Sequence, residues 1–144
     1  MNIEPRRPAR ILLVDELPII RHALRQLLAG MADLVVCGEA DSMADALRAV
    51  STLKPDLVIV ELSMGSEGTL GSVSGLELIR RLRTLESRLP VVVFSMLEED
   101  PFARLALMAG ARAYVTKRGS PVMLVGAIRE VLDPTGESPA PETR

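Results

Sequence analysis

The fold of this chain is decided by residues 55–64, which read PDLVIVELSM. Residues 57–60 are four successive apolar side chains, standing between a Pro-Asp pair and the carboxylate of Glu61. A strand that is apolar at every position is typical of a parallel sheet whose two faces are both covered by helices. We therefore predict a buried strand over residues 57–62 in an α/β domain.

Four more short apolar runs share this character, and helical patterns separate them. In the intervening segments, apolar residues recur at spacings of three and four, as in helices with one buried face. Right-handed crossovers between successive strands would arrange the strands in the order 2-1-3-4-5. The sequence thus predicts a doubly wound, five-stranded parallel sheet, with strands over residues 11–14, 34–37, 57–62, 91–94 and 113–115.

Polar residues and glycines mark the ends of several helices. Ser42 and Ser74 each precede an acidic residue by three positions, which is the pattern of a capping box. Ser120 stands before a proline, which has no amide to leave unpaired in the first helical turn. Gly30 and Gly110 are predicted helix stops.

The composition fits one folded domain with an aliphatic core. The chain has 144 residues, of which 48% are hydrophobic, 25% are charged and only 2% are aromatic. The net charge of -2 gives no general attraction to nucleic acid, whose recognition usually needs a basic face. We therefore expect this domain to make no direct contact with DNA or RNA.

The ends of the chain differ in composition from its middle. Prolines recur near both ends, so we expect an N-terminal extension over residues 1–9, a folded domain over residues 10–132 and a linker-like tail over residues 133–144. The apolar runs are far shorter than the ~18 residues of a membrane span. Cys37 has no partner for a disulfide within the chain, which favours a reducing compartment. We expect a cytoplasmic protein without membrane association.

Polar side chains follow four of the predicted strands. Asp15 and Glu16 follow the first strand, Glu61 the third, Ser95 the fourth and Lys117 the fifth. In an open parallel sheet the carboxyl ends of the strands meet at one edge, where ligands bind. Three carboxylates suit Mg²⁺, so Asp15, Glu16 and Glu61 form a candidate metal site, and Lys117 could help to neutralise a phosphoryl group. Ser95 could donate a hydrogen bond to that group.

Each of these residues also has a simpler interpretation. Taken alone, the acidic pair is more often a solvated turn, Ser95 a loop cap and Lys117 a surface charge. Their joint placement favours a site, because an unpaired Glu61 beside a buried strand would be costly, which favours a lysine or metal partner. A phosphatase with Asp15 as nucleophile would want an acid two positions later, where Leu17 stands. A flavin-binding site is disfavoured as well, because the acidic turn after the first strand would repel the phosphate of the flavin unless a metal intervened.

Four segments resemble the receiver domain of two-component response regulators, which is CheY-like and has the flavodoxin strand order. They are residues 11–16, 55–64, 94–96 and 110–117, and the resemblance extends over residues 10–132. Residues 21–24 (RHAL) and 38–40 (GEA) are similar to the NarL/FixJ, LuxR-type subgroup. The resemblance implies a signalling switch in a phosphorelay, not an enzyme, with a histidine kinase as partner. It also implies control of transcription through a helix-turn-helix output domain, which this sequence does not show; a stand-alone interaction module is the alternative.

The sequence departs from the family pattern at the acceptor position. Glu61 stands where the resemblance places the phosphate-accepting aspartate, and its extra methylene moves the carboxylate outward by about 1.5 Å, one carbon–carbon bond. In-line phosphoryl transfer depends on close positioning, so we expect an atypical receiver that is phosphorylation-independent or constitutively biased. The alternative is that a histidine kinase still phosphorylates Glu61 in the presence of Mg²⁺.

The resemblance also suggests how such a switch would reach a partner. Tyr114 resembles the aromatic switch residue of the family, and simple strand packing is the alternative for it. The face formed by the fourth helix, fifth strand and fifth helix is the expected contact for an output domain, a protein partner or a homodimer. Residues 65–75 form a longer loop than the family usually has, and we interpret it as a mobile insertion or a lid over Glu61.

Overall fold

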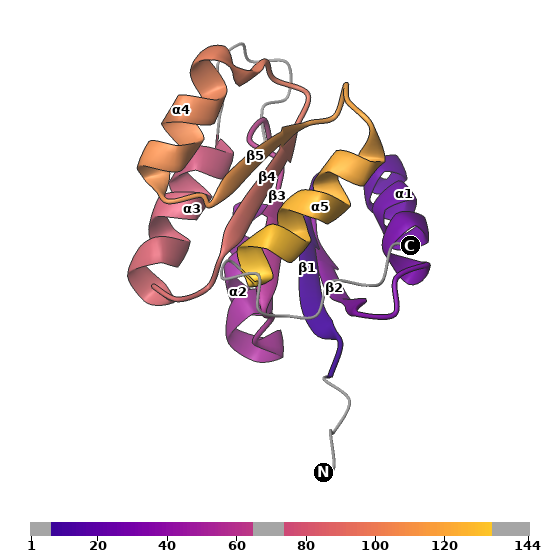
Figure 1. The fold of residues 1–144 in the computed structure, drawn as a ribbon. Coiled ribbons are helices and arrows are strands. Elements are labelled where there is room, and N and C mark those ends of the chain that lie inside the picture. Colours follow the sequence, from indigo (N-terminus) through magenta and orange to yellow (C-terminus); the bar gives the residue numbers. More distant parts are fainter. Residues whose placement is uncertain (1–6, 65–73, 134–144) are drawn as a thin grey trace.

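A computed structural model describes residues 7–64 and 74–133. It contains a parallel sheet with the strand order β2-β1-β3-β4-β5, flanked by helices on both faces (Figure 1). The predicted α/β class, doubly wound topology and strand order are confirmed. The elements are β1 (Ala9–Val14), α1 (Pro18–Ala29), β2 (Leu34–Ala40), α2 (Met43–Leu53), β3 (Leu57–Val60), α3 (Ser74–Leu85), β4 (Val91–Ser95), α4 (Glu99–Ala109), β5 (Ala113–Thr116) and α5 (Pro121–Leu132).

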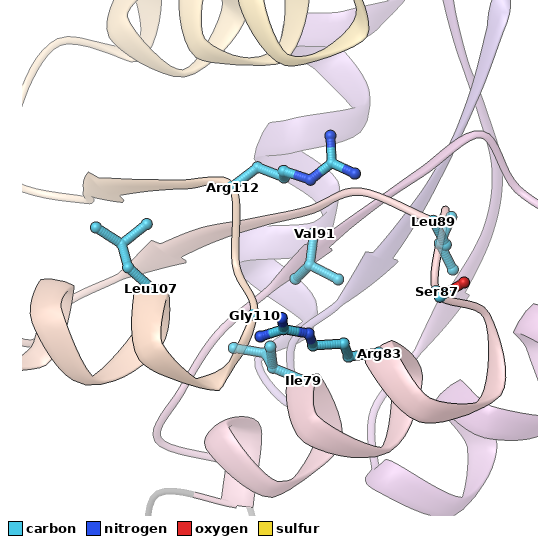
Figure 2. Close-up of a pocket in the computed structure, with 8 residues that line it drawn as sticks. All are labelled: Ile79, Arg83, Ser87, Leu89, Val91, Leu107, Gly110 and Arg112. Carbon is cyan, nitrogen blue, oxygen red and sulfur yellow. The ribbon is translucent and has the colours of Figure 1, made fainter.

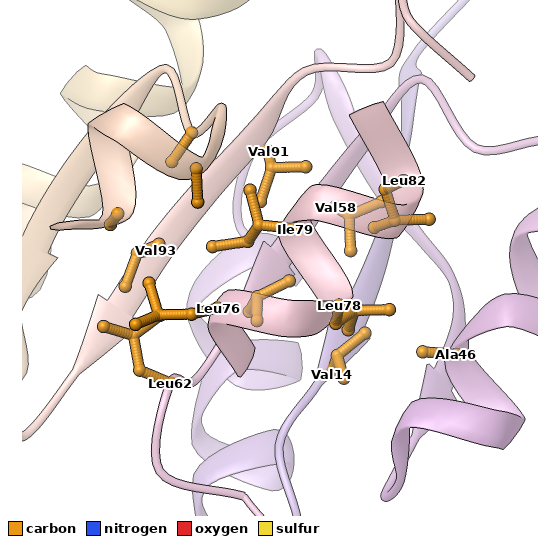
Figure 3. Close-up of a cluster of buried hydrophobic side chains, with 14 of the residues drawn as sticks. Val14, Ala46, Val58, Leu62, Leu76, Leu78, Ile79, Leu82, Val91 and Val93 are labelled. Carbon is orange, nitrogen blue, oxygen red and sulfur yellow. The ribbon is translucent and has the colours of Figure 1, made fainter. Parts of the chain in front are cut away.

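The core lies in two layers, one on each face of the sheet. Alternate residues of β3 enter different layers: Val58 and Val60 pack with α2, α3 and α4, whereas Leu57 and Ile59 pack with α1 and α5. All four side chains are at most 2% exposed. Figure 3 shows the first layer, in which α3 lays its apolar stripe against the strands. This burial on both faces is the reason why β3 has no polar residue.

Each strand differs from its predicted bounds at one end: β1 starts two residues earlier, β4 and β5 end one residue later, and β2 and β3 differ at their carboxyl ends. β2 continues to Ala40 instead of ending at Cys37, because its main chain goes on pairing with β1 up to Val14 despite the polar Glu39. β3 ends at Val60 instead of residue 62, and Leu62 follows it in a turn. Leu62 is nevertheless fully buried, so its apolar character reflects packing and not strand structure.

The helix ends largely follow the sequence signals. The Ser42 hydroxyl accepts a hydrogen bond from the Asp45 amide at 3.2 Å, and the Ser120 hydroxyl accepts one from the Val122 amide at 3.3 Å. Gly110 ends α4 with a φ of 128°, a conformation that favours glycine. Ser74 differs, because it is already the first residue of α3 and its hydroxyl donates to the carbonyl of Met64.

The Ser42→Ala variant is expected to unfold with a free energy lower by about 1 kcal/mol, because the Asp45 amide loses its acceptor. Urea denaturation followed by circular dichroism measures the change. Ser51→Ala is the matched control, since Ser51 is an exposed residue further along the same helix, and this change should be neutral or slightly stabilising. Equal effects of the two substitutions would show that the cap contributes nothing.

Several predictions concern segments outside the described residues. Most of the predicted insertion, all of the tail after Asp133 and most of the N-terminal extension fall there. The boundaries of the predicted domain therefore stay predictions. Among residues 7–64 and 74–133, no helix has the length and apolar character that crossing a membrane would require.

Candidate functional site

Four of the five polar residues predicted for the site lie together at the carboxyl edge of the sheet. Asp15, Glu61 and Ser95 are only 3%, 4% and 0% exposed, and the Lys117 side chain is 3% exposed. They meet there because β1, β3, β4 and β5 are adjacent and parallel, and each residue directly follows or ends its strand. Glu16, the fifth, is exposed.

Lys117 is the cation of this cluster. Its Nζ lies 2.6 Å from Asp15 Oδ2 and 2.9 Å from Glu61 Oε1. A buried ammonium between two buried carboxylates strongly favours the charged forms, provided that the remaining oxygens also find donors. The lysine therefore links the ends of the first and third strands to the end of the fifth.

Glu61 receives donors on both carboxylate oxygens. Oε2 accepts from the Ser95 hydroxyl and, at 3.2 Å, from the Ser63 amide. Oε1 accepts from the Met96 amide at 3.2 Å as well as from Lys117. Burial alone would raise the pKa of Glu61, but the hydrogen bonds from Ser95 and Lys117 outweigh it and hold the pKa below its ordinary value. Glu61 is therefore ionised at neutral pH.

The oxygens of Asp15 are occupied in the same way. Oδ1 accepts from the Leu17 amide at 2.9 Å, and Oδ2 accepts from Lys117. The Asp15 carbonyl in turn accepts from Arg21 at 2.5 Å. Arg21 also pairs with Glu39 at 2.7 Å, so it ties the end of β2 to the turn that carries Asp15.

This arrangement does not match the three-carboxylate Mg²⁺ site expected from the sequence. Every carboxylate oxygen of Asp15 and Glu61 already accepts from a protein donor, while Glu16 is at the surface. In the part of the chain that the structure describes, no group of three or more Asp, Glu, His or Cys side chains is placed to hold a metal ion. In this arrangement Lys117 pairs with both buried carboxylates.

Ser95 connects the carboxylate cluster to Tyr114. Its hydroxyl oxygen accepts from the Leu97 amide at 3.1 Å, and the Leu97 carbonyl accepts from the Tyr114 hydroxyl at 2.5 Å. Tyr114 is partly buried on β5, and burial raises the pKa of its hydroxyl. A continuous path of hydrogen bonds thus runs from Glu61 through the segment before α4 to β5.

Sequence reasoning missed the part that Gly75 plays in this site. A Cβ atom on Gly75 would lie 2.5 Å from Leu62 Cα and 2.6 Å from the Glu61 carbonyl oxygen. The Gly75 amide also donates to the Leu62 carbonyl at 2.9 Å. The first turn of α3 therefore lies directly against the main chain that presents Glu61, and only glycine permits this approach.

The fold and the arrangement of the site define a receiver-type domain, and comparison with known proteins identifies the family. The family model described as response regulator receiver domain matches residues 11–129, and the chain belongs to this family. Receiver domains are signalling modules of two-component systems and not enzymes, and they generally bind Mg²⁺ at the acceptor site.

The relatives narrow the class to response regulators of the LuxR/NarL type. The chain is 36% identical over 122 residues to response regulator GacA of Pseudomonas aeruginosa, which covers 85% of this chain and 54% of the relative. It is 32% identical over 123 residues to the nitrate/nitrite response regulator NarL of Escherichia coli, with coverages of 85% and 54%. The chain thus spans about half the length of these relatives.

A solved structure agrees with this assignment. A two-component response regulator of the LuxR family from Aurantimonas superposes with a TM-score of 0.79 at 34% sequence identity. The match covers 87% of this chain and 85% of that one. The chain is therefore the receiver domain of a two-component response regulator of the LuxR/NarL type.

Proposed function

We propose that this receiver domain is atypical and signals without phosphorylation. Glu61 stands at the acceptor position, and its carboxylate already accepts hydrogen bonds from Ser95, Met96 and Lys117 at the carboxyl edge of the sheet. The observation that carries this proposal is the placement of one carboxylate against the Ser95 hydroxyl, the Met96 amide and the Lys117 ammonium. A hydroxyl, an amide and an ammonium are also the donors that a phosphoryl group would require.

The proposed state does not depend on a metal ion. Mg²⁺ prefers carboxylate oxygens and several waters, and the two buried carboxylates have their oxygens engaged by Lys117 and main-chain amides. We infer that Lys117 supplies the positive charge that Mg²⁺ would otherwise bring to Asp15 and Glu61.

The output of the switch is proposed to pass through the α4–β5–α5 face. The hydrogen-bond path from Glu61 through Ser95 and Leu97 ends at Tyr114 on β5, which supports a switch role for that residue. Three partners fit this face: a DNA-binding output domain, a separate protein, or a second copy of the chain. The net negative charge of this chain supports the proposal that an output domain, and not this domain, contacts DNA. The whole protein would then be a cytoplasmic transcription regulator.

Phosphorylation of three proteins tests the proposal. Wild type, Glu61→Asp and Glu61→Gln would each be incubated with Mg²⁺ and acetyl phosphate, and intact mass would report phosphoryl incorporation. We expect none for wild type and Glu61→Gln. The Glu61→Asp variant is expected to gain an acid-labile phosphoryl group, because the shorter side chain withdraws from Ser95 and leaves room for in-line attack.

The same experiment distinguishes the alternative function. Mg²⁺-dependent incorporation into wild type that disappears in Glu61→Gln would establish a phosphorylated receiver, with a histidine kinase as the natural donor, and would end the present proposal. If incorporation into the wild type persisted in Glu61→Gln, the acceptor would be another residue, and the assignment of Glu61 would be wrong.

A further inference from the structure

Figure 2 shows the residues that line a pocket of about 230 Å³. The pocket adjoins the start of β4, whereas the carboxylate cluster adjoins the end of that strand. It sits between α3 and α4, beside Val91, the first residue of β4. Apolar side chains of Ile79, Leu89, Val91 and Leu107 line it together with two arginines, Arg83 and Arg112. The pocket therefore combines two positive charges with apolar side chains, of which Leu107 is exposed whereas Ile79 and Val91 are almost fully buried.

In the part of the chain that the structure describes, the two arginines differ from Arg80 and Arg81 in forming no ion pair with a carboxylate. On the same helix as Arg83, both Arg80 and Arg81 pair with Glu77, at 3.6 Å and 3.3 Å. Within residues 7–64 and 74–133, no carboxylate forms an ion pair with Arg83 or Arg112. Two guanidinium groups at one pocket raise the local positive potential, which attracts anions.

The aliphatic part of Arg83 packs against Gly110 at this pocket. Gly110 has a φ of 128°, and a Cβ atom there would lie 2.8 Å from Arg83 Cδ. The absence of a side chain at Gly110 thus lets the aliphatic part of Arg83 lie across the end of α4. In Figure 2 the guanidinium group of Arg83 lies beside Ile79 and Gly110, at the pocket wall.

We propose that this pocket binds a small aliphatic carboxylate. A planar guanidinium group matches a carboxylate in size and geometry and can form two parallel hydrogen bonds with it. The accessible apolar side chains of Leu89 and Leu107 would contact the hydrocarbon tail. The pocket volume of about 230 Å³ lies below the roughly 300–1,000 Å³ of pockets for drug-sized ligands, so we take a six-carbon acid as the probe.

Such a ligand would contact α3, α4 and the start of β5 together. Leu107 belongs to α4, while Arg112 immediately precedes β5 and donates its amide to the Val91 carbonyl at 2.8 Å. A carboxylate bound to Arg83 and Arg112 would therefore bridge α3 to the connection between α4 and β5. This site lies apart from Glu61 and does not depend on the function proposed for that residue.

Amide chemical shifts of the ¹⁵N-labelled chain would test the proposal. Hexanoate is expected to shift the amide signals of Ser87, Gly110 and Arg112 in a saturable manner. Two control compounds each lack one feature: 1-hexanol has no charge, and inorganic phosphate has no hydrocarbon tail. Each of these two probes should bind at least about tenfold more weakly, since each lacks one of the two contributions. Arg83→Met, which keeps the aliphatic stem, and Arg112→Gln should weaken hexanoate binding by about tenfold.

Arg80→Gln is the matched control, because Arg80 lies on the same helix and pairs with Glu77 outside the pocket. It should leave hexanoate binding unchanged. Absence of saturable shifts, or equal binding by Arg83→Met and wild type when both give native spectra, would overturn the proposal. An equal response to phosphate and hexanoate would show attraction of anions by charge alone and would overturn it as well.

Discussion

The Lys117→Met variant is expected to unfold with a free energy about 3–5 kcal/mol below that of the wild type at neutral pH. Methionine keeps most of the side-chain volume but removes the ammonium that lies 2.6 Å from Asp15 and 2.9 Å from Glu61. Two buried carboxylates would then repel each other without compensation. Urea denaturation at pH 7, followed by circular dichroism, measures the loss.

Acidification should reduce this loss. In the wild type, the lowered pKa of Glu61 stabilises the folded state at pH values above 4.5, the ordinary pKa of this group. This contribution disappears as the pH falls through the folded-state pKa. In the variant, burial acts on Glu61 without the opposing lysine, so its pKa moves upward and the carboxylate is neutralised at a higher pH. The difference between the two proteins should therefore be greatest at neutral pH and narrow towards pH ~4.

Lys54→Met is the matched control for this experiment. Lys54 is exposed at the end of α2, and its replacement should change the free energy of unfolding by no more than about 0.5 kcal/mol. If Lys117→Met were no more destabilising than Lys54→Met, Lys117 could not be the counter-ion of the buried carboxylates. The metal-independent state proposed for the site would then lose its physical basis.

The edge at which the polar residues gather could be predicted from the sequence. Parallel strands with apolar residues at every position define a sheet that is buried on both faces, and the strand ends then share one edge. Asp15, Glu61, Ser95 and Lys117 each stand at such an end, so their convergence follows from topology alone. The side-chain conformations do not enter this inference.

The partners of each carboxylate could not be predicted in the same way. Asp15 and Glu16 are adjacent in sequence, yet one is buried and the other exposed, because the chain turns between β1 and α1. The sequence indicates a lysine or a metal as the partner of Glu61, and only the folded structure places Lys117 within 2.9 Å of it. The main-chain amides of Ser63 and Met96, which donate to Glu61, could not be predicted from residue type. Every residue other than proline has such an amide.

The structural role of Gly75 could not be predicted from the sequence, for a different reason. It stands at the end of a stretch rich in glycine and serine, and the composition of the whole stretch indicates an insertion. The requirement for glycine comes from the main chain of Glu61 and Leu62, which is near in space but earlier in the sequence. A close approach of this kind becomes visible only when α3 is placed against the end of β3.

The Gly75→Ala variant is therefore expected to lose about 1–3 kcal/mol of unfolding free energy, the usual cost of forcing an extra methyl group into a packed site. Intrinsic helix propensity predicts the opposite sign, because alanine in a helix is normally about 0.5–1 kcal/mol better than glycine. The clash should win, since the atoms at 2.5 Å and 2.6 Å belong to the main chain and cannot rotate away as a side chain would.

Gly126→Ala is the control in which propensity should act alone. Gly126 lies in α5 and is exposed, and a Cβ atom added there would meet nothing within 4 Å beyond its own helix main chain and chain neighbours. This variant should gain about 0.5–1 kcal/mol, so the two Gly→Ala changes are expected to differ in sign. A stabilising Gly75→Ala would mean that α3 does not press on the chain segment carrying Glu61. If the clash does displace Glu61, combining Gly75→Ala with Lys117→Met should cost less than the sum of the single effects, because the displaced carboxylate has already lost its lysine.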